Sequence, residues 1–311
     1  MYPTKPPPIE ETLAVLADTE KPLLNSRLVR LSNLSARELE ALKQAWPRID
    51  TRRRRQIVQR LVALAEDNLE LNFDGVFKHC LKDTEAEVRR QAIEGLWENE
   101  ETSLIAPLIY LLEQDTSDKV VAAAATALGK FALLAEHGRL RPGRALRIEK
   151  ALLAATSAQD KPVEVQRRAL EAVAPLSLPE VKAAIMAAYE SQHSGLKVSA
   201  IYAMGKNYDP DWLPILLTEL DNTDAEIRYE AAGACGELGE EAAVPALIGR
   251  VNDVDIDVRL VAIQALGKVG GASAKECLQR CLNSTSEAVR ETARQALDEL
   301  MTIKDPLSFR L

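Results

Sequence analysis

One short phrase recurs along this chain, and in the C-terminal half it returns every 31 residues. Its clearest copies begin at Ile227, Val258 and Val289, each followed by an arginine and by alanines four and seven positions later. A fixed period of this length is typical of stacked helical hairpins, in which each repeat packs against its neighbours. The period therefore predicts an all-α chain, folded as a right-handed α-solenoid of about eight helical hairpins.

We call the apolar residue that opens each phrase the anchor of its repeat. The anchors are Ile57, Val88, Val120, Val165, Leu196, Ile227, Val258 and Val289. Residues four and seven positions after an anchor are mostly small, and this spacing places them on one helical face. A second apolar column lies eleven residues before the anchors, at Phe77, Ile109, Ala154, Ile185, Leu216, Leu247 and Leu278. Each repeat is therefore predicted to be a first helix, a turn and a second helix that carries the anchor.

The anchors are 31 or 32 residues apart except for one interval of 45 residues, from Val120 to Val165. This interval indicates an insertion near residues 131–147, where Pro142 and Gly143 exclude one continuous helix. Insertions in repeat proteins map to loops on one face, and such loops often bind partners. We therefore take three basic residues of this insertion as candidate partner-binding residues: Arg139, Arg141 and Arg144.

The regular array has less regular segments on both sides. Residues 1–34 are predicted to form a proline-rich N-terminal arm and a cap, and Ser35 and Glu38 have the spacing of a capping box that opens the first hairpin. The repeat array is predicted over residues 35–302, with a tail at 303–311.

Composition and charge exclude several classes of protein. The formal net charge is −8, and residues 207–300 alone hold 18 acids and 8 bases, which disfavours binding to nucleic acid phosphates. No apolar run approaches the roughly 20 residues that span a bilayer, so we predict no membrane insertion and a cytoplasmic location. The four cysteines are few for the length and lie mainly within the apolar helical pattern, as reduced core thiols do.

The full phrase, Asp-x-x-x-x-Val-Arg-x-x-Ala-x-x-Ala-Leu-Gly, is clear from Asp253 to Gly267 and recognisable from Asp83 to Trp97. It resembles the HEAT-repeat superfamily, and most of all the short bacterial repeats named for phycobilisome lyases. The resemblance covers roughly residues 50–300 and implies the fold. For function it implies a wide range, because chromophore-lyase subunits, assembly chaperones, scaffolds and a few enzymes share this architecture.

The resemblance also implies a structural ladder, in which the residue after each anchor contacts acidic or backbone groups of neighbouring repeats. Arginine occupies this position at Arg89, Arg228, Arg259 and Arg290, and Lys197 is a close substitute. Three residues at this position do not match: Val58, Val121 and Gln166. The ladder is therefore expected to be interrupted near the insertion.

Catalytic and metal-binding patterns find no support. Deoxyhypusine hydroxylase resembles this architecture and carries iron on His-Glu pairs, but none of the three histidines here precedes a glutamate. Cys277 and Cys281 lie four residues apart on one predicted helix, and we interpret them as core residues rather than as ligands that Cys235 could complete. No nucleophile elbow or glycine-rich phosphate loop is present. We assign no catalytic residue, no metal ligand and no cofactor.

Two further surface features bear on function. The run of four arginines at residues 52–55 is interpreted as a solvated helix start, with an anion or nucleic-acid patch as the alternative. Positions two and six after each anchor should form the inner surface of the array, and there Arg167, Tyr202 and Tyr229 are candidate partner-binding residues. The alternative is that both tyrosines only pack against neighbouring repeats.

These observations favour a non-catalytic scaffold or assembly factor whose partner is another protein. Two alternatives remain open at this point: a lyase-like subunit acting on a tetrapyrrole chromophore, which rests on the resemblance alone, and a nucleic-acid binding HEAT-like protein.

Overall fold

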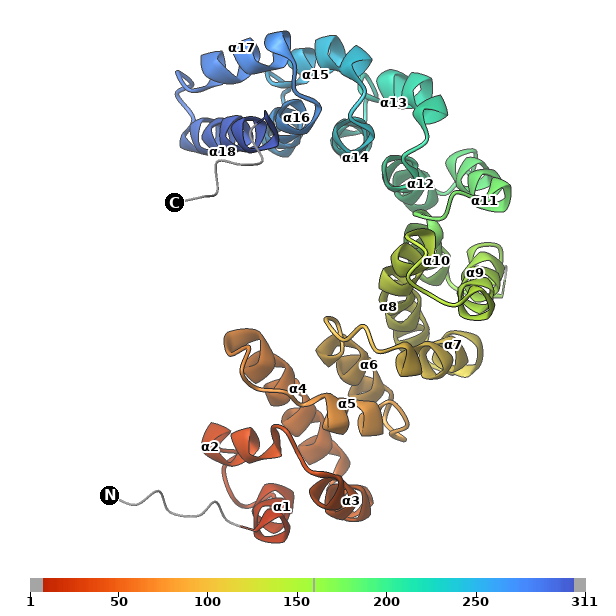
Figure 1. Ribbon diagram of the computed structural model, residues 1–311, viewed down its shortest axis with the longest axis vertical. Helices are drawn as coiled ribbons and strands as arrows, with labels where there is room; N and C mark the ends of the chain where they lie inside the picture. The colour runs from red at the N-terminus through yellow and green to blue at the C-terminus, as the bar shows by residue number, and fades with distance from the viewer. Residues whose placement is uncertain (1–7, 159, 305–311) are drawn as a thin grey trace. The chain divides into compact units, whose positions relative to one another are not determined.

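The computed structural model describes residues 8–158 and 160–304, with side chains as far as Met301. Every regular element within these ranges is a helix, which confirms the predicted all-α fold (Figure 1). Part of the predicted arm, residues 1–7, and most of the predicted tail, residues 305–311, lie outside the described residues.

Eight helical hairpins follow one another in the described chain, as the period predicted. They are α3(Ala36–Ala45) with α4(Thr51–Asp67), α5(Asp74–Cys80) with α6(Ala86–Gly95), α7(Ile105–Gln114) with α8(Asp118–Glu136), α9(Pro142–Thr156) with α10(Val163–Val173), α11(Pro179–Tyr189) with α12(Ser194–Asn207), α13(Leu213–Glu219) with α14(Ala225–Leu238), α15(Val244–Arg250) with α16(Ile256–Val269), and α17(Ala272–Cys281) with α18(Glu287–Lys304). Short 3-10 helices are η1(Val29–Leu31), η2(Trp46–Arg48), η3(Thr102–Leu104), η4(Pro210–Trp212) and η5(Glu241–Ala243).

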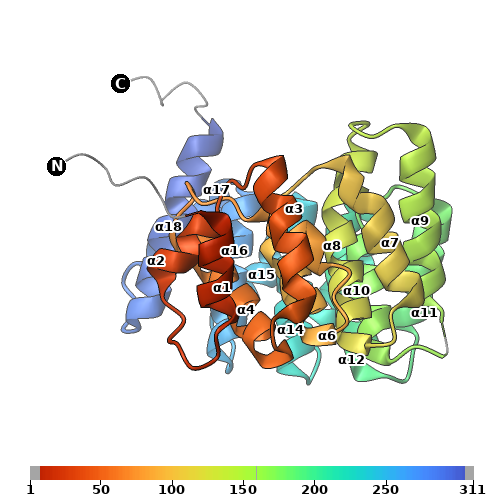
Figure 2. The ribbon, with the colours of Figure 1, turned by 90° about the horizontal axis from the view of Figure 1, so that it is seen from below.

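Two helices precede the first hairpin, α1(Ile9–Ala17) and α2(Asn25–Leu28). Helix α1 packs beside α3, as Figure 2 shows, and buries Leu13 and Leu16. The predicted capping box at the start of α3 is present: the Ser35 hydroxyl accepts the Glu38 N–H, and the Glu38 carboxylate accepts the Ser35 N–H at 3.0 Å. These contacts satisfy backbone groups that the first turn of a helix leaves without partners.

The chain separates into two compact units. Unit 1 comprises Met1–Phe131 and Leu140–Ala151, and unit 2 comprises Ala132–Arg139 and Leu152–Leu311. The boundary crosses α8 and α9, which are the two helices that the insertion lengthens. The repeat period predicted one array over residues 35–302 and did not predict this division.

The insertion is helix rather than loop, which corrects the expectation from the sequence. Helix α8 runs for 19 residues and α9 for 15, so only residues 137–141 remain between them. Pro142 is the first residue of α9, a position where its missing N–H has no helical partner to lose. The lengthened α9 also shifts the predicted core column: Ala154 is exposed, and Leu152 and Ala155 are buried instead.

Close packing of the second helices sets the core of unit 2, where α12, α14, α16 and α18 lie in one row and α11, α13, α15 and α17 in another (Figure 1). Residues four positions after the anchors are fully buried in both units: Leu61, Ala92, Ala124, Ala169, Ala200, Ala231, Ala262 and Ala293. Nine positions after three of the anchors stands a glycine whose added Cβ would come within 3.0 Å of an alanine in the next repeat: Gly205 against Ala234, Gly236 against Ala265 and Gly267 against Ala296. Small residues on both sides therefore let these helices approach closely.

The arginine after the anchor joins neighbouring repeats, as the resemblance implied. The guanidinium of Arg228 donates to the Asn222 carbonyl of its own turn at 2.9 Å. It also donates to both carboxylate oxygens of Asp253 in the next repeat, at 2.9 and 2.7 Å. Both side chains are buried, so this bidentate ion pair is well shielded from water.

Other repeats keep all or part of this arrangement, which we call the arginine ladder. The carbonyl six positions earlier accepts a hydrogen bond from each of Arg89, Arg259 and Arg290. Arg89 adds a bidentate pair with Asp115 in the next repeat. In the first hairpin Val58 cannot take part, and Arg54, one helical turn earlier, pairs with Asp83 instead at 2.6 Å. Next to the insertion Gln166 donates only to backbone carbonyls.

Candidate functional site

The candidate site lies in unit 2 on three successive second helices, α10, α12 and α14. We call Arg167, Tyr202 and Tyr229 together the tyrosine stripe. They stand two or six positions after their anchors, where a helix turns its side chains away from the alanine-rich contact face. Helix α12 packs against both α10 and α14, so the structure brings the three helices that carry the stripe together.

Arg167 is fixed by a short chain of hydrogen bonds across α10 and α12. Its Nε donates to the Ser199 hydroxyl at 2.9 Å, and this hydroxyl donates to the Glu171 carboxylate at 2.6 Å. Arg167 also pairs with Glu164 at 3.3 Å. Ser199 is buried, so the relay holds the guanidinium and the carboxylate in one geometry.

Both tyrosines present part of their rings to solvent. Tyr202 is 37% exposed and Tyr229 is 40% exposed. The Lys206 ammonium lies 5.8 Å from the centre of the Tyr202 ring, within reach of a cation–π interaction. Burial of the remainder of the side chain raises the pKa of the Tyr202 hydroxyl, so this hydroxyl stays protonated at neutral pH.

Glu230, beside Tyr229 on α14, was not identified from the sequence. Burial raises the pKa of its carboxyl to about 7, with smaller contributions from the negative charges of Glu171 and Glu226, while Arg167 opposes the shift. Within the described residues the Glu230 carboxyl forms neither a hydrogen bond nor an ion pair. The tyrosine stripe therefore has beside it a half-buried carboxyl that forms no ion pair within the described residues.

A comparison of repeats would have found Glu230. Residues three positions after the other anchors are mostly uncharged and buried, as Gln91, Ser199, Val261 and Thr292 are. Arg60 and Arg168 also stand in this column, so Glu230 is its one acidic residue, and a half-buried acid that forms no ion pair is a recognised sign of a functional position.

The three basic residues of the insertion are divided between the two units. All three side chains are exposed. Arg139 belongs to unit 2, whereas Arg141 and Arg144 belong to unit 1. The Arg144 guanidinium donates to the Thr102 hydroxyl of η3 at 2.8 Å, so it is partly engaged within unit 1.

The run of four arginines is not the solvated helix start that the sequence suggested. Arg53 and Arg54 are buried. Arg53 donates to the carbonyls of Leu16, Asp18 and Lys21, which follow or end α1, and Arg54 pairs with Asp83. These partners lie 29 to 37 residues from the arginines, and the contacts tie the N-terminal segment to α4. The buried pair is unavailable to an external anion, which weakens the nucleic-acid alternative.

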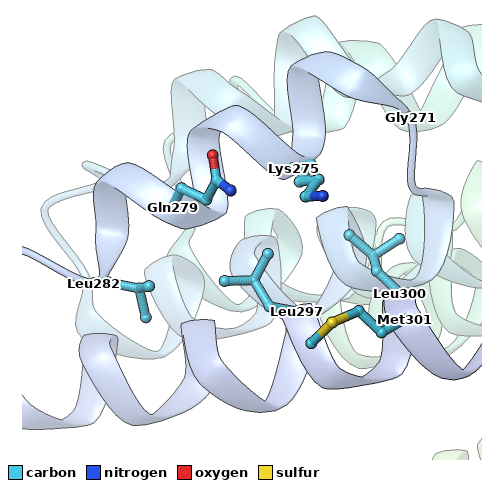
Figure 3. A pocket seen from close by; sticks show the side chains of 7 residues that line it. All are labelled: Gly271, Lys275, Gln279, Leu282, Leu297, Leu300 and Met301. Carbon is cyan, nitrogen blue, oxygen red and sulfur yellow. The ribbon is translucent and has the colours of Figure 1, made fainter.

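A hollow of about 270 Å³ between α17 and α18 is lined by Leu282, Leu297, Leu300 and Met301, with Lys275 as its one charged group (Figure 3). No group of three potential metal ligands comes together within the described residues. Of the two cysteines interpreted as core residues, Cys277 is buried, whereas Cys281 is only half-buried; Cys235 is a buried free thiol.

No described helix is both long and apolar enough to cross a membrane. No curated protein of established function matches the sequence. The complex of CpcE and CpcF of phycocyanin lyase from Nostoc sp. PCC7120 is similar in structure, with a TM-score of 0.51 and 18% identity over 91% of this chain and 97% of that chain. The YibA protein of E. coli has a TM-score of 0.46 and 16% identity over 77% of this chain and 96% of that chain. Human deoxyhypusine hydroxylase has a TM-score of 0.33 and 19% identity over 94% of this chain and 96% of that chain.

At 18% identity the likeness to the phycocyanin lyase complex concerns the fold alone. The family of HEAT repeats matches two stretches, residues 74–137 and 213–298, which contain the best-preserved copies of the phrase. This match identifies both stretches as HEAT repeats, and together with the hairpins, the buried alanine column and the arginine ladder it supports a HEAT-repeat superfamily for the chain.

Proposed function

We propose that this chain is a non-catalytic protein-binding scaffold whose contact surface on unit 2 is the tyrosine stripe. The observation that carries the proposal is the partial exposure of Tyr202 and Tyr229 on consecutive second helices. Tyrosine is enriched at the energetic centres of protein interfaces, because it adds a large ring and a hydroxyl at a small cost in conformational entropy.

The groups around the tyrosines indicate the chemistry of the partner. Glu230 is a half-buried carboxyl without a cation, and Glu171 lies close enough to raise its pKa. Glu171 is already paired with Arg168, so a lysine or arginine of the partner would pair with Glu230, while apolar groups beside it would cover the tyrosine rings. The relay from Arg167 through Ser199 to Glu171 keeps the surface rigid before binding, which lowers the entropic cost of association.

The proposal is tested by photocrosslinking and affinity capture from a lysate of the source cells. A photoreactive amino acid at position 229 should crosslink to one stoichiometric protein, and the same protein should be captured by the tagged wild type. The variant Tyr202→Ala with Tyr229→Ala should lose at least tenfold in affinity for that protein. The matched control is Tyr110→Ala on α7, because Tyr110 is 65% exposed and lies in unit 1.

Equal capture by the double variant and by the control would overturn the assignment of the surface. The lyase-like alternative is tested with the same preparation, since a lyase-like subunit should give a coloured complex when mixed with a bilin, and a scaffold should not. The nucleic-acid alternative predicts binding that weakens steeply as salt is added.

The basic residues of the insertion stay a separate proposed contact. Arg141 and Arg144 are exposed at the start of α9 in unit 1, and Arg139 is exposed in the preceding turn. An Arg141→Glu, Arg144→Glu variant should weaken capture of an acidic partner without changing crosslinking at position 229. Unchanged capture would remove these residues from the proposed contacts.

A further inference from the structure

Unit 1 contains a groove of about 810 Å³, which is independent of the tyrosine stripe in unit 2. The rings of Phe73 and Phe77 are buried among the residues that line it and pack edge to face, with their centres 6.3 Å apart. The C-terminal end of α4 contributes Val62, and the segments that follow α4 and α6 contribute Leu69 and Trp97. The groove therefore combines a buried aromatic pair with both apolar and polar side chains.

The groove is open because α6 ends early. Helix α6 has 10 residues, whereas the corresponding α14 and α16 each have 14. Gly95, its last residue, stands seven positions after the anchor, where the later repeats have alanine. A Cβ at this position would come 2.5 Å from the Phe77 ring, so the glycine leaves room for that ring. The space that another turn of α6 would fill is thus left open.

The edge of the groove is held in place by a residue from the next hairpin. The Lys130 ammonium, on α8, donates to the carbonyls of Leu96 and Trp97 at 2.7 Å each. A cation at the C-terminal end of a helix also interacts favourably with the helix dipole. This contact fixes the backbone of Trp97, whose side chain is nevertheless 60% exposed. Leu69, which also lines the groove, is 85% exposed.

The ionisable groups that line the groove are all acidic: Glu66, Asp74, Glu94 and Glu98. Glu94 pairs with Arg90, and Asp74 accepts a hydrogen bond from Asn99. Glu66 and Glu98 are exposed and form no ion pair within the described residues. A groove that combines apolar side chains with two unpaired carboxylates is complementary to a segment that carries both apolar and cationic side chains.

We propose that this groove binds a lysine- or arginine-rich segment of a partner protein, which inserts bulky apolar side chains between Leu69 and Trp97 and places its cations against Glu66 and Glu98. The apolar anchors supply affinity in such a mode, and the charges select the partner and its orientation.

The proposal is tested with a phage-displayed library of random peptides selected on the full chain. Peptides that also bind the variant Glu66→Lys with Glu98→Lys are removed by counter-selection. The expected peptides are basic and contain leucine, phenylalanine or tryptophan. The best of them, made synthetically with a fluorescent label, should lose at least tenfold in affinity for the charge-reversed variant and for Trp97→Ala.

The matched control is Glu276→Lys with Glu299→Lys, which makes the same change in net charge at exposed positions of unit 2. Its affinity for the peptide should stay within twofold of the wild type. Because the charge-reversed residues are exposed, that variant remains informative even where Trp97→Ala folds poorly.

Three outcomes would overturn the proposal. The selection could return no groove-dependent peptide, or acidic ones. The control could lose as much affinity as the charge-reversed variant, which would show nonspecific attraction. Finally, deletion of residues 2–7 could raise the affinity for the peptide tenfold. Alternatively, the wild type could self-associate and the charge-reversed variant could fail to do so. In those cases the occupant is this chain's own N-terminal segment or a second copy rather than a partner.

Discussion

The contact between Gly236 and Ala265 gives a sharp prediction about how closely the second helices must pack. A Cβ added at Gly236 would lie 2.8 Å from the Ala265 Cα and 2.9 Å from its Cβ. Carbon atoms prefer a separation of about 3.5–4.0 Å, so the substitution Gly236→Ala requires α14 and α16 to move apart by up to about 1 Å. Overpacking of this kind costs roughly 1–3 kcal/mol in the free energy of unfolding.

Alanine also favours the helix over glycine by about 1 kcal/mol, which would partly hide this cost. Gly233→Ala, on the same helix, provides the control because its Cβ would meet only Val261, at an ordinary 3.5 Å. Both variants gain the same helix propensity. The difference between their free energies of unfolding therefore isolates the overlap, and we expect about 1–3 kcal/mol in favour of Gly233→Ala.

The measurement is urea denaturation, with the loss of helix followed by circular dichroism in the far ultraviolet. Adding Ala265→Gly to Gly236→Ala should recover part of the lost stability, because it removes one of the two overlapping atoms. If Gly236→Ala proves as stable as Gly233→Ala, the close approach of α14 and α16 is not under steric control and the reasoning fails.

Three other perturbations follow from the same contacts. The Glu230 carboxyl has a pKa of about 7 in the folded chain, against an ordinary value of 4.5. The folded chain therefore binds this proton more tightly than the unfolded chain does. The free energy of unfolding should fall as the pH rises from about 4.5 to 7. Glu230→Gln should remove this fall and be the more stable above pH 7 by up to about 3 kcal/mol, measured by denaturation at several pH values. Asp253→Asn should cost about 3–5 kcal/mol by leaving Arg228 buried without a counter-charge, and Arg228→Met in the same chain should recover part of that loss in a double-mutant cycle. In a thiol titration of the native protein Cys281 should react first, because Cys80, Cys235 and Cys277 are buried.

Most of the fold could be predicted from the repeat period, because every hairpin must pack its second helix closely against the neighbouring repeats. Alanine stands four positions after every anchor except Ile57, where Leu61 takes the place, and all of these residues are buried where second helices pack. The arginine ladder followed from the resemblance, and its hydrogen bonds are present at Arg89, Arg228, Arg259 and Arg290.

The sequence was less informative where the outcome depends on distant partners. A period shows how many residues are inserted but not whether they extend a helix, and Pro142 is compatible with either because it can begin one. The burial of Arg53 and Arg54 depends on groups 29 to 37 residues away, which local composition cannot reveal. Whether the tyrosine stripe and the insertion bind partners stays a prediction, because exposure alone does not identify a partner.

The arginine ladder has a consequence for how this chain folds during its synthesis. Arg89 and Arg228 leave the ribosome 25 or 26 residues before their acidic partners, Asp115 and Asp253. The carbonyls six positions earlier have already emerged, so each guanidinium can close its own turn at once and accept the carboxylate later. A nascent hairpin is thus held locally until the next one arrives to dock on it, and growth of the array proceeds in the direction of translation.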